Sequence, residues 1–191
     1  MKQFKDLMNG HIYLCPDNDQ RFAQGRGERK DIIFEYNHTK PSELKFDPLR
    51  PIFESCGENV YIEPPFYANC GGMFTSIGNN VYANFGLTLV DDGPITIGNN
   101  VLFGPHVMIT TTGHPVDPDI RKATYQFSEP VVIEDNVWVG GDVVILPGVT
   151  IGENSIIGAH STVTKDIPAN CIALGNPCRV VREINEKDKE Y

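Results

Sequence analysis

The sequence predicts an all-β fold, a parallel β-helix of six-residue repeats preceded by a short helical segment. Three observations support this prediction. Apolar β-branched residues recur every six positions in the second half of the chain, the repeat breaks near 111–130, and the first part of the chain lacks it. A period of six fits neither a 3.6-residue helix nor simple strand alternation. It fits a strand and a turn on each side of a prism whose coils stack by parallel pairing.

The repeat is clearest from Ile133 onward, where the chain divides into IEDNVW, VGGDVV, ILPGVT, IGENSI, IGAHST and VTKDIP. Every unit opens with Ile or Val, and its fifth residue is small or β-branched. The same register occurs in IGNNVY from Ile77 and in IGNNVL and FGPHVM from Ile97. We therefore expect one β-branched residue per side to point inward, with Gly or Asn relieving the corners.

The chain divides into three parts on this pattern. Residues 1–57 carry charged and apolar residues at helical spacings, so we expect one or more helices there. We assign 58–177 to the β-helix, with an inserted loop near 111–130, and 178–191 to a charged C-terminal tail. The inserted segment lacks inward-facing aliphatic residues and must leave the prism. A loop held by a rigid scaffold is a favoured position for chemistry, and this loop contains His114.

Composition narrows the class of protein. The 191 residues are 40% hydrophobic and 21% charged, as in a folded globular protein. A formal net charge of -9 argues against general binding to nucleic acid or to an anionic membrane. No apolar run approaches the roughly 20 residues that span a bilayer, and the start lacks a signal peptide, so we expect a cytoplasmic protein. The five cysteines lack zinc-site spacing and are expected to be reduced thiols.

The histidines and two aspartates are the residues whose roles need weighing. A lone histidine is more often structural than catalytic, but His114 lies in the interrupting loop. We expect His38 to tie the helical segment to the prism, and His106 and His160 to be surface or interface residues. Asp91 and Asp92 could simply cap the turn before Gly93-Pro94, or they could contact a ligand. The remaining histidine is His11.

Six stretches together carry a resemblance to a known family: EYNHTKPSE, IEPPFY, YANFGLTLVDD, TTGHPVD, NVWVGGDVVILPGVTIGENSIIGAHSTVTKDIP and GNPCRVVREIN. They resemble the hexapeptide-repeat acetyltransferases, and within them the maltose and galactoside O-acetyltransferase group. The resemblance implies a left-handed parallel β-helix and a homotrimer with active sites between subunits. It also implies acetyl-coenzyme A as donor and a sugar hydroxyl, of maltose, a glucoside or a galactoside, as acceptor.

The resemblance assigns roles by position, and no metal is among them. It implies that His114 and Asn84 are catalytic. The implied acceptor-binding residues are Asp17, with Asp19 as the next candidate, Asn69, Tyr82, Asn84 and Asp92. The implied donor-binding residues are Trp138, Gly141, Ala159, Thr164, Lys165, Arg179 and Arg182. Asn69 or Cys70 occupies the place of a small hydroxyl residue, and the loop lacks a Glu found in relatives, so the acceptor's identity stays open.

This chemistry suits a histidine. A sugar hydroxyl is a poor nucleophile at neutral pH, so a general base must take its proton as it attacks the thioester. Histidine, with an ordinary pKa of about 6.5, can do this and return the proton to the departing thiolate, which typically contributes about 10² to 10⁴-fold in rate. Backbone N–H groups near Gly140 and Gly141 are expected to stabilise the oxyanion. No covalent acyl-enzyme is required.

Three alternatives stay open from sequence. The acceptor could be a non-sugar hydroxyl, of an antibiotic or an amino acid, although EYNHTKPSE favours the sugar group. The prism could instead form a metal-dependent hydratase. A catalytic zinc site needs three protein ligands, and His106, His114 and His160 would supply that number. It could also be a non-catalytic scaffold, which would be expected to lack the histidine or the cations for coenzyme A.

Overall fold

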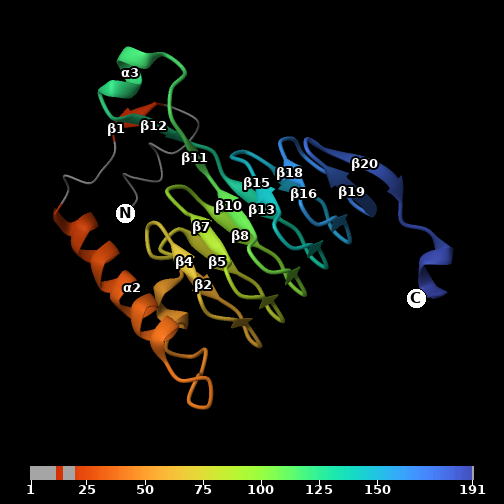
Figure 1. Ribbon diagram of the computed structural model, residues 1–191, viewed down its shortest axis with the longest axis horizontal. Coiled ribbons are helices and arrows are strands. Elements are labelled where there is room, and N and C mark those ends of the chain that lie inside the picture. The colour runs from red at the N-terminus through yellow and green to blue at the C-terminus, as the bar shows by residue number, and fades with distance from the viewer. Residues whose placement is uncertain (1–11, 15–19, 191) are drawn as a thin grey trace.

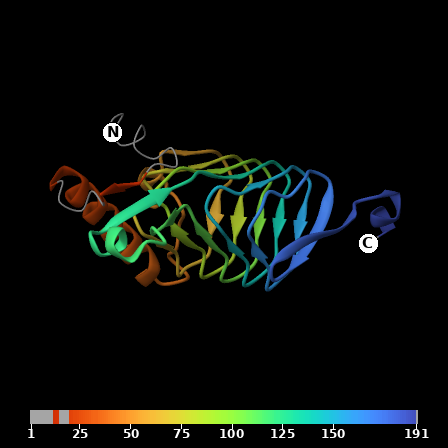
Figure 2. The ribbon, with the colours of Figure 1, turned by 90° about the horizontal axis from the view of Figure 1, so that it is seen from above.

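The chain winds into a left-handed parallel β-helix with three faces (Figure 1, Figure 2). The computed structural model describes residues 12–14 and 20–190, apart from the side chain of residue 21. Face 1 comprises β2 (Ser55–Cys56), β5 (Thr75–Ile77), β8 (Ile95–Ile97), β13 (Val131–Ile133) and β16 (Thr150–Ile151). Face 2 comprises β3 (Tyr61–Ile62), β6 (Tyr82–Ala83), β9 (Leu102–Phe103), β14 (Trp138–Val139), β17 (Ile156–Ile157), β19 (Cys171–Gly175) and β20 (Cys178–Glu183). Face 3 comprises β4 (Tyr67–Ala68), β7 (Thr88–Val90), β10 (Met108–Thr110), β15 (Val144–Ile145) and β18 (Thr162–Val163).

The six-residue period places two residues of each repeat in the core. The first residue pairs in register with its equivalents in neighbouring coils, as Ile133 does with Ile97 and Ile151. All three are buried. The fifth residue is buried as well, for example Val137 and Val143, both 0% exposed. The expectation of one inward residue per side was therefore incomplete, because the turn at each corner also directs a side chain into the prism.

The corner between faces 1 and 2, corner 1–2, repeats the same turn in every coil. An asparagine with φ between 54° and 61° occupies each turn, a left-handed conformation that Asn tolerates better than most residues. Each side-chain amide donates to the side-chain oxygen of the next asparagine at 2.9–3.0 Å. This Asn ladder comprises Asn59, Asn80, Asn100, Asn136, Asn154 and Asn170.

A helical region lies beside the N-terminal coils (Figure 1). It consists of α2 (Gln20–His38) and the short η2 (Arg50–Ile52). Asn37 fixes α2 to the prism: its Nδ2 donates to the carbonyl oxygen of Phe66 at 2.8 Å, and its Oδ1 accepts from the N–H of Phe66 at 2.9 Å. No helix among the described residues is long and apolar enough to cross a membrane.

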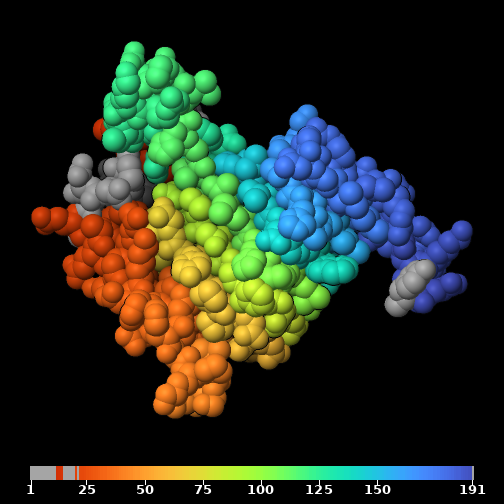
Figure 3. All heavy atoms as spheres, in the orientation of Figure 1, coloured from red at the N-terminus to blue at the C-terminus, as the bar shows by residue number. Residues whose placement is uncertain are grey.

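Two segments extend from the regular coils. Between β10 and β13 the chain forms a hairpin of β11 (Thr112–Gly113), α3 (Pro118–Lys122) and β12 (Tyr125–Ser128), which stands out from the prism (Figure 3). Strand β1 (Tyr13–Leu14) pairs with β12 and completes a small sheet in the order β1-β12-β11. At the other end, β20 pairs antiparallel with β19 and leads to η3 (Glu186–Glu190), so residues assigned to the tail extend face 2.

Candidate active site

The corner between faces 3 and 1, corner 3–1, carries the segments that depart from the repeat. The turns 69–74 and 91–94 and the hairpin follow β4, β7 and β10, so the parallel stacking of face 3 brings them together. A cavity of about 770 Å³ lies between these segments, face 3 and α2. A second cavity, of about 390 Å³, shares part of its lining with the first. The shared residues are Asn69, Asp92, His114 and Gln126.

His114 follows β11 and lines both cavities. Its Nδ1 lies 3.1 Å from the carbonyl oxygen of Tyr125 on the opposite strand of the hairpin. Because a carbonyl oxygen can only accept, Nδ1 carries the proton and Nε2 of the neutral ring is the proton-accepting nitrogen. Arg121 holds the turn after His114 by donating to the carbonyl oxygens of Pro115 and Val116 at 3.0 and 2.9 Å. The hairpin thus fixes both the position and the tautomer of this histidine.

Asn69 and Asp92 form a hydrogen-bonded pair opposite the histidine. Asn69 Nδ2 donates to Asp92 Oδ2 at 2.8 Å. Arg26 of α2 orients the pair, because its Nη2 donates to Asn69 Oδ1 at 3.2 Å and its Nε donates to the Asn69 carbonyl oxygen at 2.9 Å. Of the two candidates for the small-hydroxyl position, Asn69 lines the cavities. Cys70 is buried against Tyr13 and Phe74, and this burial raises the pKa of its thiol.

Asp91 holds the turn that carries Asn69. Its carboxylate accepts from the N–H groups of Cys70 at 2.7 Å and Gly72 at 2.8 Å. Burial raises the pKa of Asp91 to about 7, against the opposing effect of its backbone hydrogen bonds. Asp91 therefore does cap a turn, but the turn belongs to the preceding coil and not to Gly93. Asp92, directly beside it, faces the cavities.

Other predicted acceptor-side residues lie away from these cavities. Tyr82, on face 2, is 37% exposed and stacks on Tyr61. Asn84 follows it at the corner between faces 2 and 3, corner 2–3, where its Oδ1 accepts from the N–H of Phe85. Asp17 and the next candidate, Asp19, lie outside the described residues. One chain thus brings together His114, Asn69 and Asp92, but not Tyr82 or Asn84.

The predicted donor residues are also spread over the surface, and none lines the two cavities. They lie on face 2, at corner 2–3, and at the end of face 3 where the last coil enters corner 3–1. Trp138 is on face 2 and 52% exposed. The others are Gly141 and Ala159 at corner 2–3, Thr164 and Lys165 after β18, and Arg179 and Arg182 on β20.

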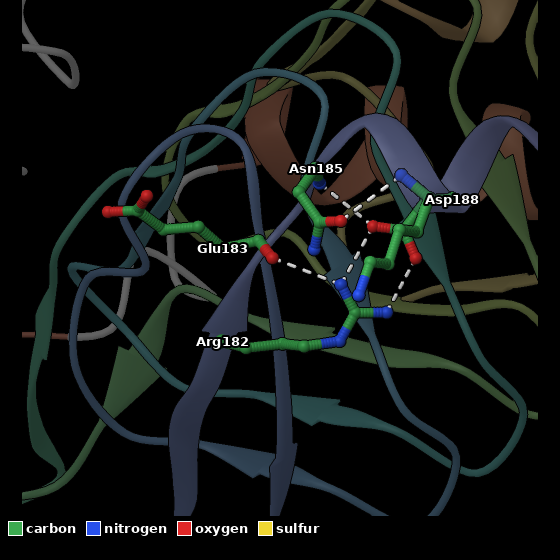
Figure 4. A network of polar contacts seen from close by, with 5 residues as sticks. Arg182, Glu183, Asn185 and Asp188 are labelled. Carbon is green, nitrogen blue, oxygen red and sulfur yellow. Dashed lines mark hydrogen bonds and ion pairs between the residues drawn. The ribbon is translucent and has the colours of Figure 1, made fainter.

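Arg182 is engaged by an acidic partner in this arrangement (Figure 4). Its Nη1 and Nη2 donate to the two carboxylate oxygens of Asp188 at 2.7 and 2.6 Å, and Nη1 also donates to the Glu183 carbonyl oxygen at 3.0 Å. The hydrogen bond from Arg182 lowers the pKa of Asp188 to about 2. A phosphate group would have to compete with this carboxylate for the guanidinium.

The other described histidines lie apart from His114. His38 Nδ1 bonds to the carbonyl oxygen of Phe34 within α2, so the expected tie to the prism is made by its neighbour Asn37 instead. His106 and His160 lie at corner 2–3, with ring nitrogens 3.4 and 3.7 Å from Asp142. Within one chain the three ligands of the hydratase alternative are therefore not assembled, and no group of His, Cys, Asp and Glu in its described part is arranged to hold a metal ion.

Two residues of the site were missed from sequence, Arg26 and Gln126. Arg26 lies on a helix whose packing onto the turn 69–74 no short motif predicts. Gln126 gives no sequence signal either, because aromatic and polar residues alternate in Tyr125–Ser128, and only the structure shows that Gln126 and Ser128 are on the buried side. A buried polar pair in a strand is informative.

Comparison with known proteins gives a consistent result. Residues 130–165 match the family model described as bacterial transferase hexapeptide (six repeats). The galactoside O-acetyltransferase of Escherichia coli (strain K12) is 52% identical over 180 residues, covering 93% of this chain and 88% of that protein. A galactoside acetyltransferase solved in complex with coenzyme A matches with a TM-score of 0.90 and 44% identity, covering 100% of this chain and 94% of that chain.

The maltose O-acetyltransferase of Clostridium difficile 630 also matches with a TM-score of 0.90, at 39% identity, covering 97% of this chain and 99% of that chain. The fold and its stacked repeats therefore agree with these similarities over nearly the whole length. This chain belongs to the hexapeptide-repeat acetyltransferases, in the group of the galactoside and maltose O-acetyltransferases.

Proposed function

We propose that this protein transfers the acetyl group of acetyl-coenzyme A to a sugar hydroxyl, with His114 as the general base. One observation carries the assignment of the base: the bond from Nδ1 to the Tyr125 carbonyl oxygen leaves Nε2 as the proton acceptor beside a cavity that also contains Asn69 and Asp92. The relatives support the substrates, since they are named galactoside and maltose O-acetyltransferases and one was solved with coenzyme A.

In this mechanism the acceptor hydroxyl lies against His114 Nε2. As its oxygen forms a bond to the thioester carbonyl carbon, Nε2 takes the hydroxyl proton, and the Tyr125 carbonyl oxygen stabilises the imidazolium through Nδ1–H. When the carbon–sulfur bond breaks, the imidazolium returns the proton to the thiolate of coenzyme A. Asp92 accepts hydrogen bonds from other hydroxyl groups of the sugar, with its orientation fixed by Asn69.

The assembly in this proposal is a homotrimer with each active site between two subunits. Support comes from the separation of the site within one chain: His114 lies on the hairpin, while Asn84 and Tyr82 lie on face 2 and its corner. Large apolar side chains exposed on faces 2 and 3 and at the corner between them fit burial by a second copy. They are Tyr67, Tyr82, Phe85, Leu102, Met108 and Trp138.

A mixing experiment tests the shared site. We expect His114→Ala and Asn84→Ala to be inactive alone, and to regain activity when the two are unfolded and refolded together, because about a quarter of randomly assembled interfaces would combine both intact residues. The refolded single variants, and wild type refolded at the same concentration, are the controls. No recovery in the mixture, with wild type fully recovered, would contradict a site built from two subunits.

On the donor side, Lys165, Arg179 and Arg182 supply positive charge for the phosphate groups of coenzyme A, with Trp138, Gly141, Ala159 and Thr164 along the rest of the donor. The need for local cations follows from the net charge of -9. On the oxyanion side the proposed donor is the backbone N–H of Gly141, because the N–H of Gly140 already donates to the carbonyl oxygen of Ile157 at 2.8 Å. A cytoplasmic location and the absence of nucleic-acid, membrane and metal partners stay predictions.

Release of free coenzyme A thiol from acetyl-coenzyme A tests the reaction and the base. The acceptor panel contains glucosides, galactosides, maltose and non-sugar alcohols. We expect sugar-dependent release by wild type, and a rate about 10² to 10⁴-fold lower for His114→Ala. The matched control is Lys122→Ala, at the exposed tip of the same hairpin. Full activity of His114→Ala would contradict its role, and release only with non-sugar alcohols would contradict the sugar acceptor.

A further inference from the structure

A chain of buried polar groups runs beneath the hairpin and ends at the cavity. Gln126 Nε2 lies 2.9 Å from the hydroxyl of Tyr13, which lies 2.6 Å from Ser128 Oγ. Ser128 Oγ lies 3.2 Å from Thr112 Oγ1, and Thr112 Oγ1 lies 2.7 Å from the carbonyl oxygen of Phe127. The chain therefore connects β1, β12 and β11, three strands that position the His114 loop.

The last member fixes the direction of every bond in the chain. The Phe127 carbonyl oxygen can only accept, so the Thr112 hydroxyl donates to it and must accept from Ser128. Ser128 then accepts from the Tyr13 hydroxyl. Burial raises the pKa of Tyr13, so its hydroxyl keeps the proton that it donates. Tyr13, having used its one proton, accepts from Gln126.

This direction decides which way the Gln126 amide is turned, a choice that ordinarily has to be inferred from its partners. The NH₂ group must face Tyr13, so Oε1 is left on the other side. Gln126 is only 5% exposed, yet it lines both cavities together with Asp92 and His114. Within the described part of the chain, Oε1 makes no hydrogen bond, and it is not among the buried atoms sealed from solvent without a partner.

We propose that Gln126 is an acceptor-binding residue whose Oε1 accepts a hydrogen bond from a second hydroxyl group of the sugar. The inference rests on the proposed function and narrows its substrate class. Asp92 and Gln126 both present hydrogen-bond acceptors, and His114 Nε2 accepts the proton of the reacting hydroxyl. The site is therefore complementary to a polyol that carries free hydroxyls beside the one acetylated. A simple alcohol lacks these donors, and an acceptor with those hydroxyls methylated cannot donate.

The test measures ligand binding separately from turnover. Dissociation constants of a methyl galactoside and its monodeoxy analogues are measured by titration in the presence of coenzyme A, for wild type and Gln126→Leu. We expect Gln126→Leu to bind the parent sugar about tenfold more weakly, the usual loss for one neutral hydrogen bond. One deoxy analogue should bind wild type as weakly as the variant binds the parent, and that analogue should show no further loss in the variant.

Equal losses for the parent and for every analogue, or no loss at all, would overturn the role of Gln126. Tyr13→Phe gives a second measure, because it removes the partner that orients the amide without touching the cavity lining. Tyr13→Phe should lower the ratio between the dissociation constants of this deoxy analogue and of the parent sugar, by a smaller factor than Gln126→Leu does. The thermal midpoint is recorded as a check of folding. Sugar binding that follows this pattern without any release of coenzyme A would refute the proposed reaction. It would still support the hydrogen bond from a second sugar hydroxyl to Gln126.

Discussion

Corners 1–2 and 3–1 of the prism contain polar residues in quite different environments. At corner 1–2 the same asparagine turn recurs in successive coils, and the amides bond to one another along the stack at the surface. At corner 3–1 three successive coils depart from the repeat, each in its own way, and two carboxylates there are buried. Asp91 is 0% exposed and Asp92 is 9% exposed.

The difference shows how a repeat protein separates stability from chemistry. A ladder of identical side chains satisfies its own hydrogen bonds, so corner 1–2 leaves little for a ligand. Corner 3–1 turns its carboxylate, amide and imidazole groups toward a cavity, where some hydrogen-bonding capacity remains unused. Changes at corner 1–2 should alter stability alone, and changes at corner 3–1 should alter activity as well.

The largest effect in this comparison is expected for Asp91→Asn. The amide replaces one hydrogen-bond acceptor of the turn 70–72 by a donor, so we expect a loss of about 1–3 kcal/mol in the free energy of unfolding at pH 5. Because the turn carries Asn69, the KM for the sugar should also rise. Urea denaturation and acceptor kinetics measure the two effects. An unchanged KM would contradict the link between the turn and the Asn69–Asp92 pair.

The same variant has a pH signature. The pKa of Asp91 is raised to about 7 in the folded protein, so the folded state holds this proton more tightly than the unfolded chain does. The wild-type free energy of unfolding should therefore fall relative to that of Asp91→Asn as pH rises from about 4 to about 7. The stability advantage of wild type over Asp91→Asn, measured as the difference in their free energies of unfolding, should therefore shrink over this pH range. An advantage that grows would contradict the raised pKa.

An intermediate effect is expected at corner 1–2. Asn136 lies inside the ladder with φ of 60°, so Asn136→Ala loses two side-chain hydrogen bonds and leaves the left-handed turn to a residue that tolerates this conformation less well than Asn does. We expect a loss of about 1–2 kcal/mol in the free energy of unfolding, with kcat and KM unchanged. The matched control is Asn136→Gly, which loses the same hydrogen bonds without the backbone strain. Equal losses in both variants would show that strain contributes nothing.

The smallest effect is expected at the tip of the hairpin. Lys122 pairs with Asp119 at 3.1 Å, and their side chains are 77% and 87% exposed. Such surface pairs contribute little, so Lys122→Ala should leave the thermal midpoint and the rate of coenzyme A release close to wild type. A large loss of activity would extend the functional part of corner 3–1 from the base of the hairpin to its tip.

Much of the fold was accessible from sequence because the period of six is local. Ile133, Val139 and Ile145 open consecutive units, and all three are buried as their pattern predicts. The role of His38 was wrong, since its neighbour Asn37 makes the contact to the prism. The burial of the fifth residue of each unit was missed, because a spacing does not reveal where a corner turn directs its side chain.

The candidate site was accessible only in part. His114 stands out in the sequence because it interrupts a pattern, and Asp92 because it lies in an irregular stretch. Arg26 and Gln126 gave no comparable signal. Arg26 reaches Asn69 across 43 positions, and the Tyr13 hydroxyl reaches Ser128 across 115. Such pairs become neighbours only when the coils stack and β1 joins the hairpin.

The sequence by itself determined the prism, its stacking and the point at which the chain leaves it, because each depends on residues a few positions apart. Tertiary structure alone decided which polar groups meet at corner 3–1, which nitrogen of His114 accepts a proton and which way Gln126 is turned. The physical reason is that a hydrogen bond has a direction and a short range. Its donor and acceptor are defined only after folding has brought distant segments within about 3 Å of each other.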